Sequence, residues 1–497
     1  MFWKCLHPPA PFKGGFIMPA PFKGGFMMPA TFNGGLMMSA PLRRWAARGT
    51  GSKIEFFFDL KQKKLFEQFP PVTKQEWMDK IAADLKGADF NERLVWNTGE
   101  GFTIMPFYTR EDLKDLNHLD GFLPLVLRRD VTAADPGKTT QNIPSSWLIR
   151  QNIKVSDYSA ANKKALSILK KGIDSLGFII EDPESINEKN FTVLLDGINP
   201  ETSEINFLSN GKAREIISLL IRICEKKGIG ISTLRGAVEA DPLGRLMLNG
   251  TLCIPVEAGF DYLASLTKET AVLPHYRNIH INGSNLTNAG SGSVKELGLS
   301  LSMAVEYLSQ LTGRGISAGE AASKIRFSFG IGSDYFMEMA KLRAARILWS
   351  IVADAYQAED NNSFRMEIHS VTKLWNDTVS DPYINMLRTQ TEAMSAVLGG
   401  TDSLTVNPFD AGYTVPDEFS ERIARNQQLI LKEEAWFDKV ADPSAGSYYI
   451  ENLTALLAEN SWKLFLAIEN MGGFISALDS GFVREKIAGS TSEEPEK

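Results

Sequence analysis

The sequence predicts an α/β fold, a (β/α)8 TIM barrel that follows an extended N-terminal arm. The chain has 497 residues, which exceeds one ordinary compact domain and suits a large barrel with extensions. From about residue 146 onward, short β-type runs alternate with amphipathic helical runs. About eight such units with short connections favour a closed parallel barrel over an open sheet. The expected strands span residues 147–153, 177–180, 191–195, 230–238, 278–283, 325–330, 365–371 and 403–407.

The first 50 residues contain a tandem repeat of period ten at residues 9–38, PAPFKGGFIM, PAPFKGGFMM and PATFNGGLMM. Each copy carries Pro and Gly-Gly, which break both helices and strands. We therefore expect residues 1–50 to be a low-complexity, disordered segment or a mis-annotated start, outside the fold.

Residues 51–107 are expected to form the arm, which wraps a partner and contains one helix. Thr73 is the expected N-cap, and Gly87 suits the end of the helix. Trp77, Ile81 and Leu85 recur at helical spacing and form one apolar face. A helix with so little core beside it usually packs on something larger.

The barrel is expected at residues 108–480, and a polar linker or tail at 481–497. The clearest helix of the barrel follows Gly332, with Ser333 as its expected N-cap. Its expected apolar face consists of Phe336, Ala340, Ala344, Ile347 and Ile351.

Composition excludes several classes of function. Apolar residues make up 43% and charged residues 23% of the chain, as in soluble globular proteins. The net charge of −7 gives no basic surface for nucleic acid or an anionic membrane. Cys5, Cys224 and Cys253 lie far apart, which favours a reducing, cytoplasmic compartment. No apolar run reaches the roughly 18 residues of a membrane span.

In such a barrel, chemistry lies at the C-terminal ends of the strands. Few polar residues expected there suit general acid catalysis at neutral pH, for which histidine is the usual donor. His369 is the histidine nearest to an expected strand end, but a position on the helix side is the commoner arrangement. The polar residues expected at strand ends are Gln151, Asp196, Glu239, Asp241, Ser284, Asn285, Ser370 and Asn407.

Three further features favour structural roles. The turn at residues 288–293 opens a helix, so its backbone amides can hold a phosphate or carboxylate, although a capping loop is commoner. Glu433 and Glu434 are adjacent and do not converge on one point, which favours a solvated face. Cys224 and Cys253 are expected to be small core residues. Composition and spacing alone therefore predict neither a catalytic set nor a substrate.

Several segments together resemble the methylmalonyl-CoA mutase family: HINGSNLTNAGS, FGIGSDYFMEMAKLRAARILW, SDPYINMLRTQTEAMSAVLGGTDSL and FSERIARNQQLILKEEAWFDKVADPSAGSYYIENLT. The arm LFEQFPPVTKQEWMDKIAADLKGADF, with RGAVEADPLGRL, is similar to the small (beta) subunit of the heterodimeric bacterial enzyme. The resemblance covers roughly residues 65–486. It implies a (β/α)8 barrel with pantetheine threading its axis, and a radical interconversion of methylmalonyl-CoA and succinyl-CoA with adenosylcobalamin.

The residues to which the resemblance assigns chemistry are replaced in this sequence. The active chain carries Tyr-His where this chain has Ser284 and Asn285, and Gln where it has Glu239. Asn285 can donate a hydrogen bond but cannot supply a proton, and Glu239 would repel a substrate carboxylate. The resemblance therefore implies no catalytic, cofactor-binding or metal-binding residue in this barrel. Three more replacements concern the substrate-carboxylate Arg, a second His and a Tyr, which fall at about Asn249, Thr405 and Asn142.

The resemblance also implies that cobalamin is bound elsewhere. Family cobalamin domains ligate cobalt through the His of a DxHxxG motif, whereas His118 begins an HxxG with Leu116 at the Asp position. We expect His118 to be a loop histidine. The sequence ends where a flavodoxin-like cobalamin-type domain would begin, so that domain is expected to be absent. Adenosylcobalamin is then expected on the partner, the large (alpha) subunit of a heterodimer.

The function implied is therefore that of a non-catalytic small subunit of methylmalonyl-CoA mutase. Two alternatives stay open. One is a catalytic barrel of another acyl-CoA mutase, of the isobutyryl-CoA type, with cobalamin on a separate chain. The other is a non-enzymatic CoA-binding or chaperone-like protein that joins no mutase.

Overall fold

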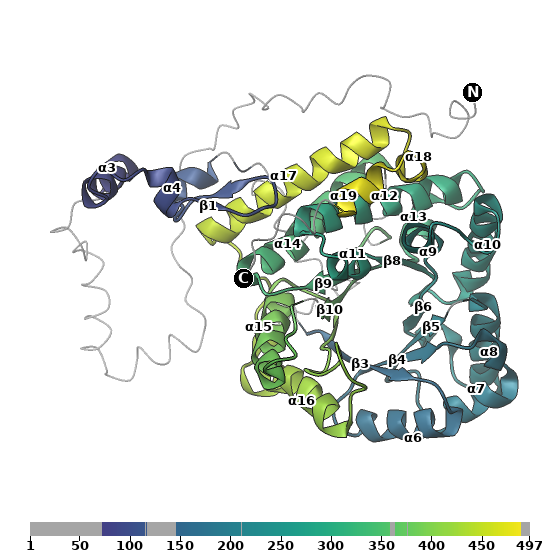
Figure 1. Cartoon of the computed structure of the whole chain (residues 1–497). Coiled ribbons are helices and arrows are strands. Elements are labelled where there is room, and N and C mark those ends of the chain that lie inside the picture. The colour runs from purple at the N-terminus through teal and green to yellow at the C-terminus, as the bar shows by residue number, and fades with distance from the viewer. Residues whose placement is uncertain are drawn as a thin grey trace, which may run out of the picture. The chain divides into compact units, whose positions relative to one another are not determined.

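The computed structural model describes residues 72–114, 116, 146–209, 211–357, 363–374 and 376–488 (Figure 1). These residues divide into two compact units, residues 72–95 and residues 96–488. Four sequence predictions fall outside the described residues: those for the repeat, for His118, for Asn142 and for the last nine residues of the tail.

The first unit contains two helices, α3 (Lys74–Asp84) and α4 (Phe90–Leu94). Thr73 caps α3 as predicted, because its Oγ1 accepts from the Glu76 amide at 3.2 Å and its own amide donates to the Glu76 carboxylate at 2.8 Å. None of the residues of α3 is buried, and Trp77 is 48% exposed. Capping therefore stabilises this helix more than packing does.

The second unit is built on one parallel sheet whose strand order is β7-β6-β5-β4-β3-β11-β10-β9-β8. Only Asn278 separates β7 from β8; β7 pairs with β6, and β8 pairs with β9. The two segments together act as one strand, so the sheet closes into an eight-stranded barrel, which confirms the predicted fold class. The strands are β3 (Leu148–Lys154), β4 (Ser175–Ile180), β5 (Glu204–Ser209), β6 (Gly236–Val238), β7 (Tyr276–Arg277), β8 (Ile279–Asn282), β9 (Ile325–Ile331), β10 (Ile368–Thr372) and β11 (Ser403–Thr405).

Helices surround the barrel (Figure 1). In the part of the chain that the structure describes, none of them has the length and apolar character needed to cross a bilayer. The α-helices of this unit are α6 (Tyr158–Leu169), α7 (Glu188–Leu194), α8 (Ala213–Lys226), α9 (Pro242–Asn249), α10 (Val256–Glu269), α11 (Ser284–Asn288), α12 (Ser293–Thr312), α13 (Ala318–Ala322), α14 (Tyr335–Ala355), α15 (Asn385–Leu398), α16 (Glu418–Leu429), α17 (Tyr448–Asn470), α18 (Phe474–Asp479) and α19 (Phe482–Ala488). Short 3-10 or π turns are η2 (Arg110–Leu113), η4 (Pro183–Ser185), η5 (Ile231–Thr233), η6 (Thr270–Val272), η7 (Pro382–Ile384), η8 (Ile430–Glu434) and η9 (Phe437–Lys439).

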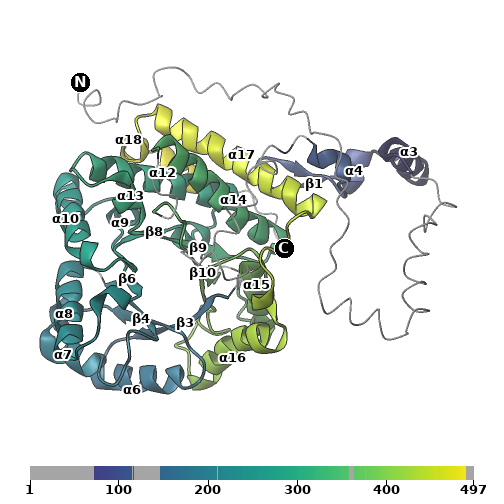
Figure 2. The ribbon, with the colours of Figure 1, turned by 180° about the vertical axis from the view of Figure 1, so that it is seen from behind.

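Helix α17 lies alongside α12 and α14 on one side of the barrel, as both views show (Figures 1 and 2). Gly298 lets α12 and α17 approach closely, because a Cβ at this position would meet the Leu464 side chain of α17 at 2.9 Å. Arg343 of α14 donates to the buried Glu451 of α17 at 2.7 Å. The segment after the last strand is therefore packed into the barrel unit. A hairpin of β1 (Trp96–Asn97) and β2 (Thr103–Ile104) belongs to the same unit.

Six of the eight expected strands are confirmed, and a seventh is shortened because η5 occupies the start of residues 230–238. The expected strand at residues 191–195 is wrong, since this segment lies at the end of α7. Asn187 caps that helix by accepting from the Asn190 amide at 3.0 Å, and Phe191 and Leu194 are buried on one helical face. The strand that takes its place is β5. Its sequence does not read as an apolar run, because Glu204 and Asn206 interrupt it.

The helix after Gly332 is α14, as expected, but two details of its start differ. Asp334 rather than Ser333 is its N-cap, and its carboxylate accepts from the Met337 amide. Phe336 is 51% exposed, whereas Ala340, Ala344 and Ile347 are buried as predicted.

Candidate functional site

The inward positions of the barrel strands carry charged and polar side chains instead of the small or apolar ones that usually fill a barrel. They alternate along each strand, as Arg150 and Asn152 do on β3 and Arg326 and Ser328 do on β9. These side chains meet across the barrel and form the polar core described below.

Arg150 and Glu239 form a buried ion pair across the interior. Arg150 Nη2 donates to Glu239 Oε1 at 2.7 Å, and the side chains are 1% and 5% exposed. His280 Nδ1 lies 3.4 Å from the other oxygen of Glu239. Burial alone would raise the pKa of Glu239, but Arg150, with help from His280, holds that pKa below its ordinary value.

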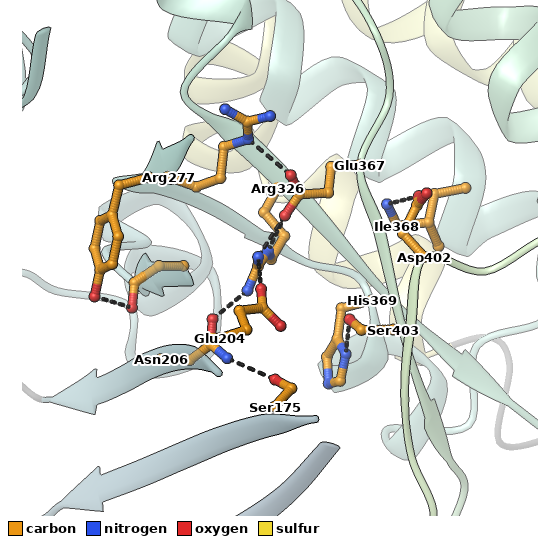
Figure 3. Close-up of polar contacts among 12 residues, drawn as sticks. Ser175, Glu204, Asn206, Arg277, Arg326, Glu367, Ile368, His369, Asp402 and Ser403 are labelled. Atoms are coloured by element: carbon orange, nitrogen blue, oxygen red, sulfur yellow. Dashed lines mark hydrogen bonds and ion pairs between the residues drawn. The ribbon is translucent and has the colours of Figure 1, made fainter. Parts of the chain in front are cut away.

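A second cluster surrounds the Arg326 guanidinium (Figure 3). Arg326 pairs with Glu204, donates to Asn206 Oδ1 at 2.5 Å and donates to Glu367 at 2.6 Å. Arg277 donates to the same Glu367 carboxylate at 2.9 Å. These residues lie near the beginnings of their strands, so the cluster closes the end of the barrel opposite the mouth.

His280 also contacts Ser328, with Nε2 at 2.6 Å from Oγ. Ser328, His280 and Glu239 thus follow each other as in a hydrolytic triad. All three side chains are buried, however, and Arg150 engages the carboxylate. These contacts are therefore part of the buried polar core.

His369 faces the barrel interior, and the sequence-based preference for the helix side is wrong. Its Nδ1 lies 2.8 Å from Ser403 Oγ (Figure 3). Its Nε2 lies 3.3 Å from Thr405 Oγ1. Burial lowers the pKa of His369 well below its ordinary value, and Arg150 and Arg326 lower it further. The imidazole is therefore neutral at physiological pH.

Gly177 on β4 leaves the space that this polar core needs. A Cβ on Gly177 would lie 2.0 Å from Asn152 Oδ1 and 3.0 Å from Arg150 Nε. Asn152 in turn accepts from Arg150 Nε at 3.1 Å. The first, second and fourth strands are therefore built to place one guanidinium across the barrel axis.

At the mouth, Ser284 and Asn285 begin α11 directly after β8. Ser284 is buried and donates to Asn282 Oδ1 at 2.6 Å, which holds its hydroxyl within the turn. Asn249 ends α9 and is exposed, while Thr405 contacts His369 inside the barrel. Among the described positions at which the resemblance places replacements, Ser284 and Asn285 are neighbours at the mouth.

Asp241 also has a structural role. It caps α9, accepting from the Gly244 amide at 2.8 Å and from the Tyr307 hydroxyl at 2.8 Å. Burial raises the pKa of this carboxyl, and these donors together with His280 oppose the rise.

The turn at residues 288–293 is occupied by a carboxylate of the same chain. Glu100, in the β1–β2 hairpin, accepts from the Ser293 amide at 2.6 Å and from the Val294 amide at 3.0 Å. Gly292 provides the room, since a Cβ there would meet the Glu100 carboxylate at 2.2 Å. The predicted anion-holding amides are thus used to cap α12.

The remaining candidates do not converge on one site. Gln151 faces outward and donates to Glu421 of α16 at 3.0 Å, and Asn407 donates to the Thr372 carbonyl at 2.6 Å. Ser370 is buried. The expected place of Asp196 at the mouth is wrong, because it follows α7 and no strand.

The acidic pair and the cysteines give mixed outcomes. Glu433 and Glu434 are exposed within η8, as a solvated face requires. Cys224 is buried as expected, but Cys253 is exposed, which contradicts the core position predicted for it.

Comparison with known proteins decides the family. Residues 184–497 match the family model described as methylmalonyl-CoA mutase. The methylmalonyl-CoA mutase small subunit of Porphyromonas gingivalis is 42% identical over 439 residues, which cover 86% of this chain and 68% of that protein. The chain belongs to the methylmalonyl-CoA mutase family. The resemblance inferred from the sequence is therefore confirmed.

Other members of the methylmalonyl-CoA mutase family match over a similar part of the chain. The small subunit of Streptomyces virginiae is 33% identical, covering 87% of this chain and 69% of that protein. The methylmalonyl-CoA mutase of Cereibacter sphaeroides is 35% identical, covering 84% of this chain and 61% of that protein. The chain thus spans about two thirds of the length of these relatives.

The described residues do not fit the cobalt of the cobalamin that the family uses. His280 and His369 are buried within the barrel and hydrogen-bonded there, and His275 lies before β7, at the end opposite the mouth. Across the described part of the chain, no group of three or more His, Cys, Asp or Glu side chains could hold a metal ion. These residues therefore provide no cobalt ligand for cobalamin in the described part of the chain.

Proposed function

We propose that this chain is the non-catalytic small subunit of a methylmalonyl-CoA mutase. It pairs with a catalytic large subunit as a heterodimer and supports the adenosylcobalamin-dependent interconversion of methylmalonyl-CoA and succinyl-CoA. The thioester and the cofactor are then bound by the large subunit. Such a complex belongs in the cytoplasm, in propionate metabolism.

One observation carries this proposal: buried ion pairs cross the barrel interior, through which the pantetheine arm would pass. Arg150 reaches Glu239 from the first strand to the fourth, and Arg326 reaches Glu204 from the sixth strand to the third. Opening the axis would separate these pairs in a buried setting. Separating one such pair typically costs about 3–5 kcal/mol.

The mouth supports the same proposal. Ser284 and Asn285 offer a hydroxyl and an amide, neither of which can donate a proton as an imidazolium does. Asn249 offers no guanidinium to bind a substrate carboxylate. The groups required for an acid-assisted rearrangement of a carboxylated thioester are therefore missing at these positions.

The arm supports pairing with another subunit. Helix α3 exposes Trp77 and buries none of its residues, although it is well capped. An amphipathic helix in this condition gains stability when a partner covers its apolar face.

Reconstitution with a large subunit from the same genome tests the proposal. The chain alone, given adenosylcobalamin and methylmalonyl-CoA, should form no succinyl-CoA, and the heterodimer should form it. The heterodimer should also keep its activity longer at elevated temperature than the large subunit alone.

Three outcomes would overturn this function. Turnover by the chain alone would make it a catalyst. Turnover of isobutyryl-CoA with a free cobalamin-domain protein would favour the alternative mutase. CoA binding without any association with a large subunit would favour the CoA-binding or chaperone-like alternative.

A further inference from the structure

Two consecutive glycines join α17 to α18. Gly472 and Gly473 have φ values of 102° and 95°, which residues with a side chain rarely adopt. Phe474, the first residue of α18, is buried, and α18 packs against both α17 and α12 at one corner of the barrel unit (Figures 1 and 2). A two-glycine turn has the backbone freedom of a hinge, so the contacts of α18 decide whether this hinge stays closed.

Two carboxyl groups meet in this corner. Glu306 lies on α12, where its Oε1 accepts from Gln310 Nε2 at 2.9 Å. The amides of Phe474 and Ile475, at the start of α18, also hydrogen-bond to the Glu306 carboxylate. Glu469 lies on the last turn of α17, and the charge of Glu306 acts on its carboxyl group. One carboxyl group therefore holds the start of α18, and a second one lies near it.

The groups that hydrogen-bond to Glu306 are neutral, and the Arg314 guanidinium is kept one step away. Arg314 Nη1 donates to Gln310 Oε1 at 2.8 Å, so the Gln310 side chain stands between the guanidinium and Glu306. Arg314 also forms ion pairs with Glu257 at 2.6 Å and Asp261 at 2.7 Å, both on α10. The negative charge of Glu257 adds slightly to the rise in the pKa of Glu306.

The two carboxyl groups differ in their hold on a proton. Burial, together with the charge of Glu306, raises the pKa of Glu469 to about 7. Burial also raises the pKa of Glu306, but the hydrogen bonds from Gln310 and from the α18 amides oppose that rise. Glu469 is therefore the member of the pair that keeps a proton. Burial raises the pKa of the neighbouring Tyr356 and Tyr307 above 10, so both stay neutral.

We propose that Glu306 and Glu469 form a proton-dependent latch that keeps the two-glycine turn closed and α18 packed against the barrel unit. With a proton on Glu469, the pair carries one negative charge, which the α18 amides stabilise. When that proton is lost, two like charges face each other away from water. Movement of α18 outward relieves this repulsion, because water then reaches both carboxylates. The latch belongs to this chain alone, so it holds or fails independently of the proposed function.

The pH range of the latch follows from proton linkage. With α18 packed, the pKa of Glu469 is about 7, and with α18 released into water it returns to the ordinary 4.5. The packed form therefore binds more protons between these two values, and its advantage falls as the pH rises through this range. The ratio of released to packed α18 should rise by roughly tenfold per pH unit within the range and level off above it.

Amide hydrogen exchange of the full chain tests the latch, once the rates are corrected for the intrinsic effect of pH. In wild type, opening at residues 474–480 should increase by about 10-fold or more from pH 5 to pH 7, and level off above pH 7.5. Glu469→Gln keeps the shape of the side chain but cannot ionise, so it should make this opening nearly independent of pH. Equal pH dependence in wild type and Glu469→Gln would overturn the inference.

Two further variants complete the test. Glu459→Gln is the matched control, because Glu459 lies on the same helix but pairs with Lys463 at 2.8 Å on an exposed surface. Its exchange at residues 474–480 should follow wild type, and loss of the pH dependence in this variant would contradict a specific role of Glu469. Glu306→Gln removes the other charge and should shift the transition to lower pH. A transition at the wild-type pH in Glu306→Gln would mean that the two carboxyl groups are not coupled, and the paired latch would be wrong.

Discussion

Arg150 Nη2 lies 2.7 Å from Glu239 Oε1, although the two residues stand on the first and fourth strand positions of the barrel. The pair therefore spans the interior. Gly177 and Asn152 shape the space for the guanidinium on one side, and His280 contacts the carboxylate on the other. Burial would raise the pKa of Glu239, and the charge of Arg150 opposes that rise, so the carboxylate depends on the guanidinium to remain ionised.

Removing one member of this pair should be worse than removing both. We expect Arg150→Met to lower the free energy of unfolding by about 3–5 kcal/mol, since Glu239 then remains buried without its partner. The double variant Arg150→Met/Glu239→Leu should recover a large part of that loss. Urea unfolding of the four proteins in a double-mutant cycle measures the difference. Additive effects would show that the pair is not coupled.

The buried histidines predict sensitivity to acid. Burial holds the pKa of His280 and His369 below the ordinary 6.5. The two imidazoles therefore stay neutral in the folded chain at pH values at which they take up protons in the unfolded chain. Stability from this source is present above pH 6.5 and is lost as the pH falls below it, by about 1.4 kcal/mol per pH unit for each histidine. Unfolding of His369→Asn and wild type from pH 7.5 to 5.5 should show their difference shrinking. A constant difference would contradict the buried, neutral state.

The sequence was sufficient for the barrel because most of its strands are short apolar runs between amphipathic helices. It was not sufficient for β5, where Glu204 and Asn206 take inward positions and interrupt the run. Phe191 and Leu194 were misassigned because a short helix can bury the same residues as a strand. Propensity alone does not distinguish the two cases.

The sequence could have indicated that the barrel has a polar core, but not which of its side chains contact one another. His280 alternates with Asn282 on one expected strand and Arg326 alternates with Ser328 on the next, which marks polar inward positions. Which charges meet depends on strand order and register, since Arg326 and Glu204 are 122 residues apart. The sequence therefore suggests that inward positions are polar, and the order of the strands in the closed sheet determines which of these side chains pair.

Glu392 predicts a second pH effect, of opposite direction. Burial raises the pKa of this carboxyl from 4.5 to about 8, so the folded chain keeps a proton that the unfolded chain loses. Its contribution to stability is present below pH 4.5 and is lost as the pH rises toward 8. Glu392→Gln keeps the acceptor for Asn376 and removes the titration. In urea unfolding from pH 5 to 8, the free energy of unfolding of the variant should rise relative to that of wild type. A constant difference over this range would refute the prediction.

Glu100 should stabilise the start of α12. We expect Glu100→Ala to lower the free energy of unfolding by about 1–2 kcal/mol, because two amides of the helix lose their acceptor. Amide hydrogen exchange should show faster exchange at Ser293 and Val294 in the variant. Glu76, whose carboxylate caps α3 in the other compact unit, is the control. Glu76→Ala should leave exchange at the start of α12 unchanged, and equal effects of the two variants would contradict a local cap.

Gly177→Ala tests whether the barrel interior is as closely filled as the contacts indicate. The new Cβ would lie 2.0 Å from Asn152 Oδ1, so Asn152 must move and its hydrogen bond from Arg150 must break. Overpacking of this kind typically costs about 1–3 kcal/mol. Gly259→Ala is the matched control, because Gly259 lies within α10 and its Cβ would meet the nearest side chain at 3.9 Å. That substitution should leave stability unchanged or raise it slightly, since alanine favours helices. Thermal unfolding of both variants measures the difference. A Gly177→Ala protein as stable as wild type would mean that the barrel interior has free space beside Arg150.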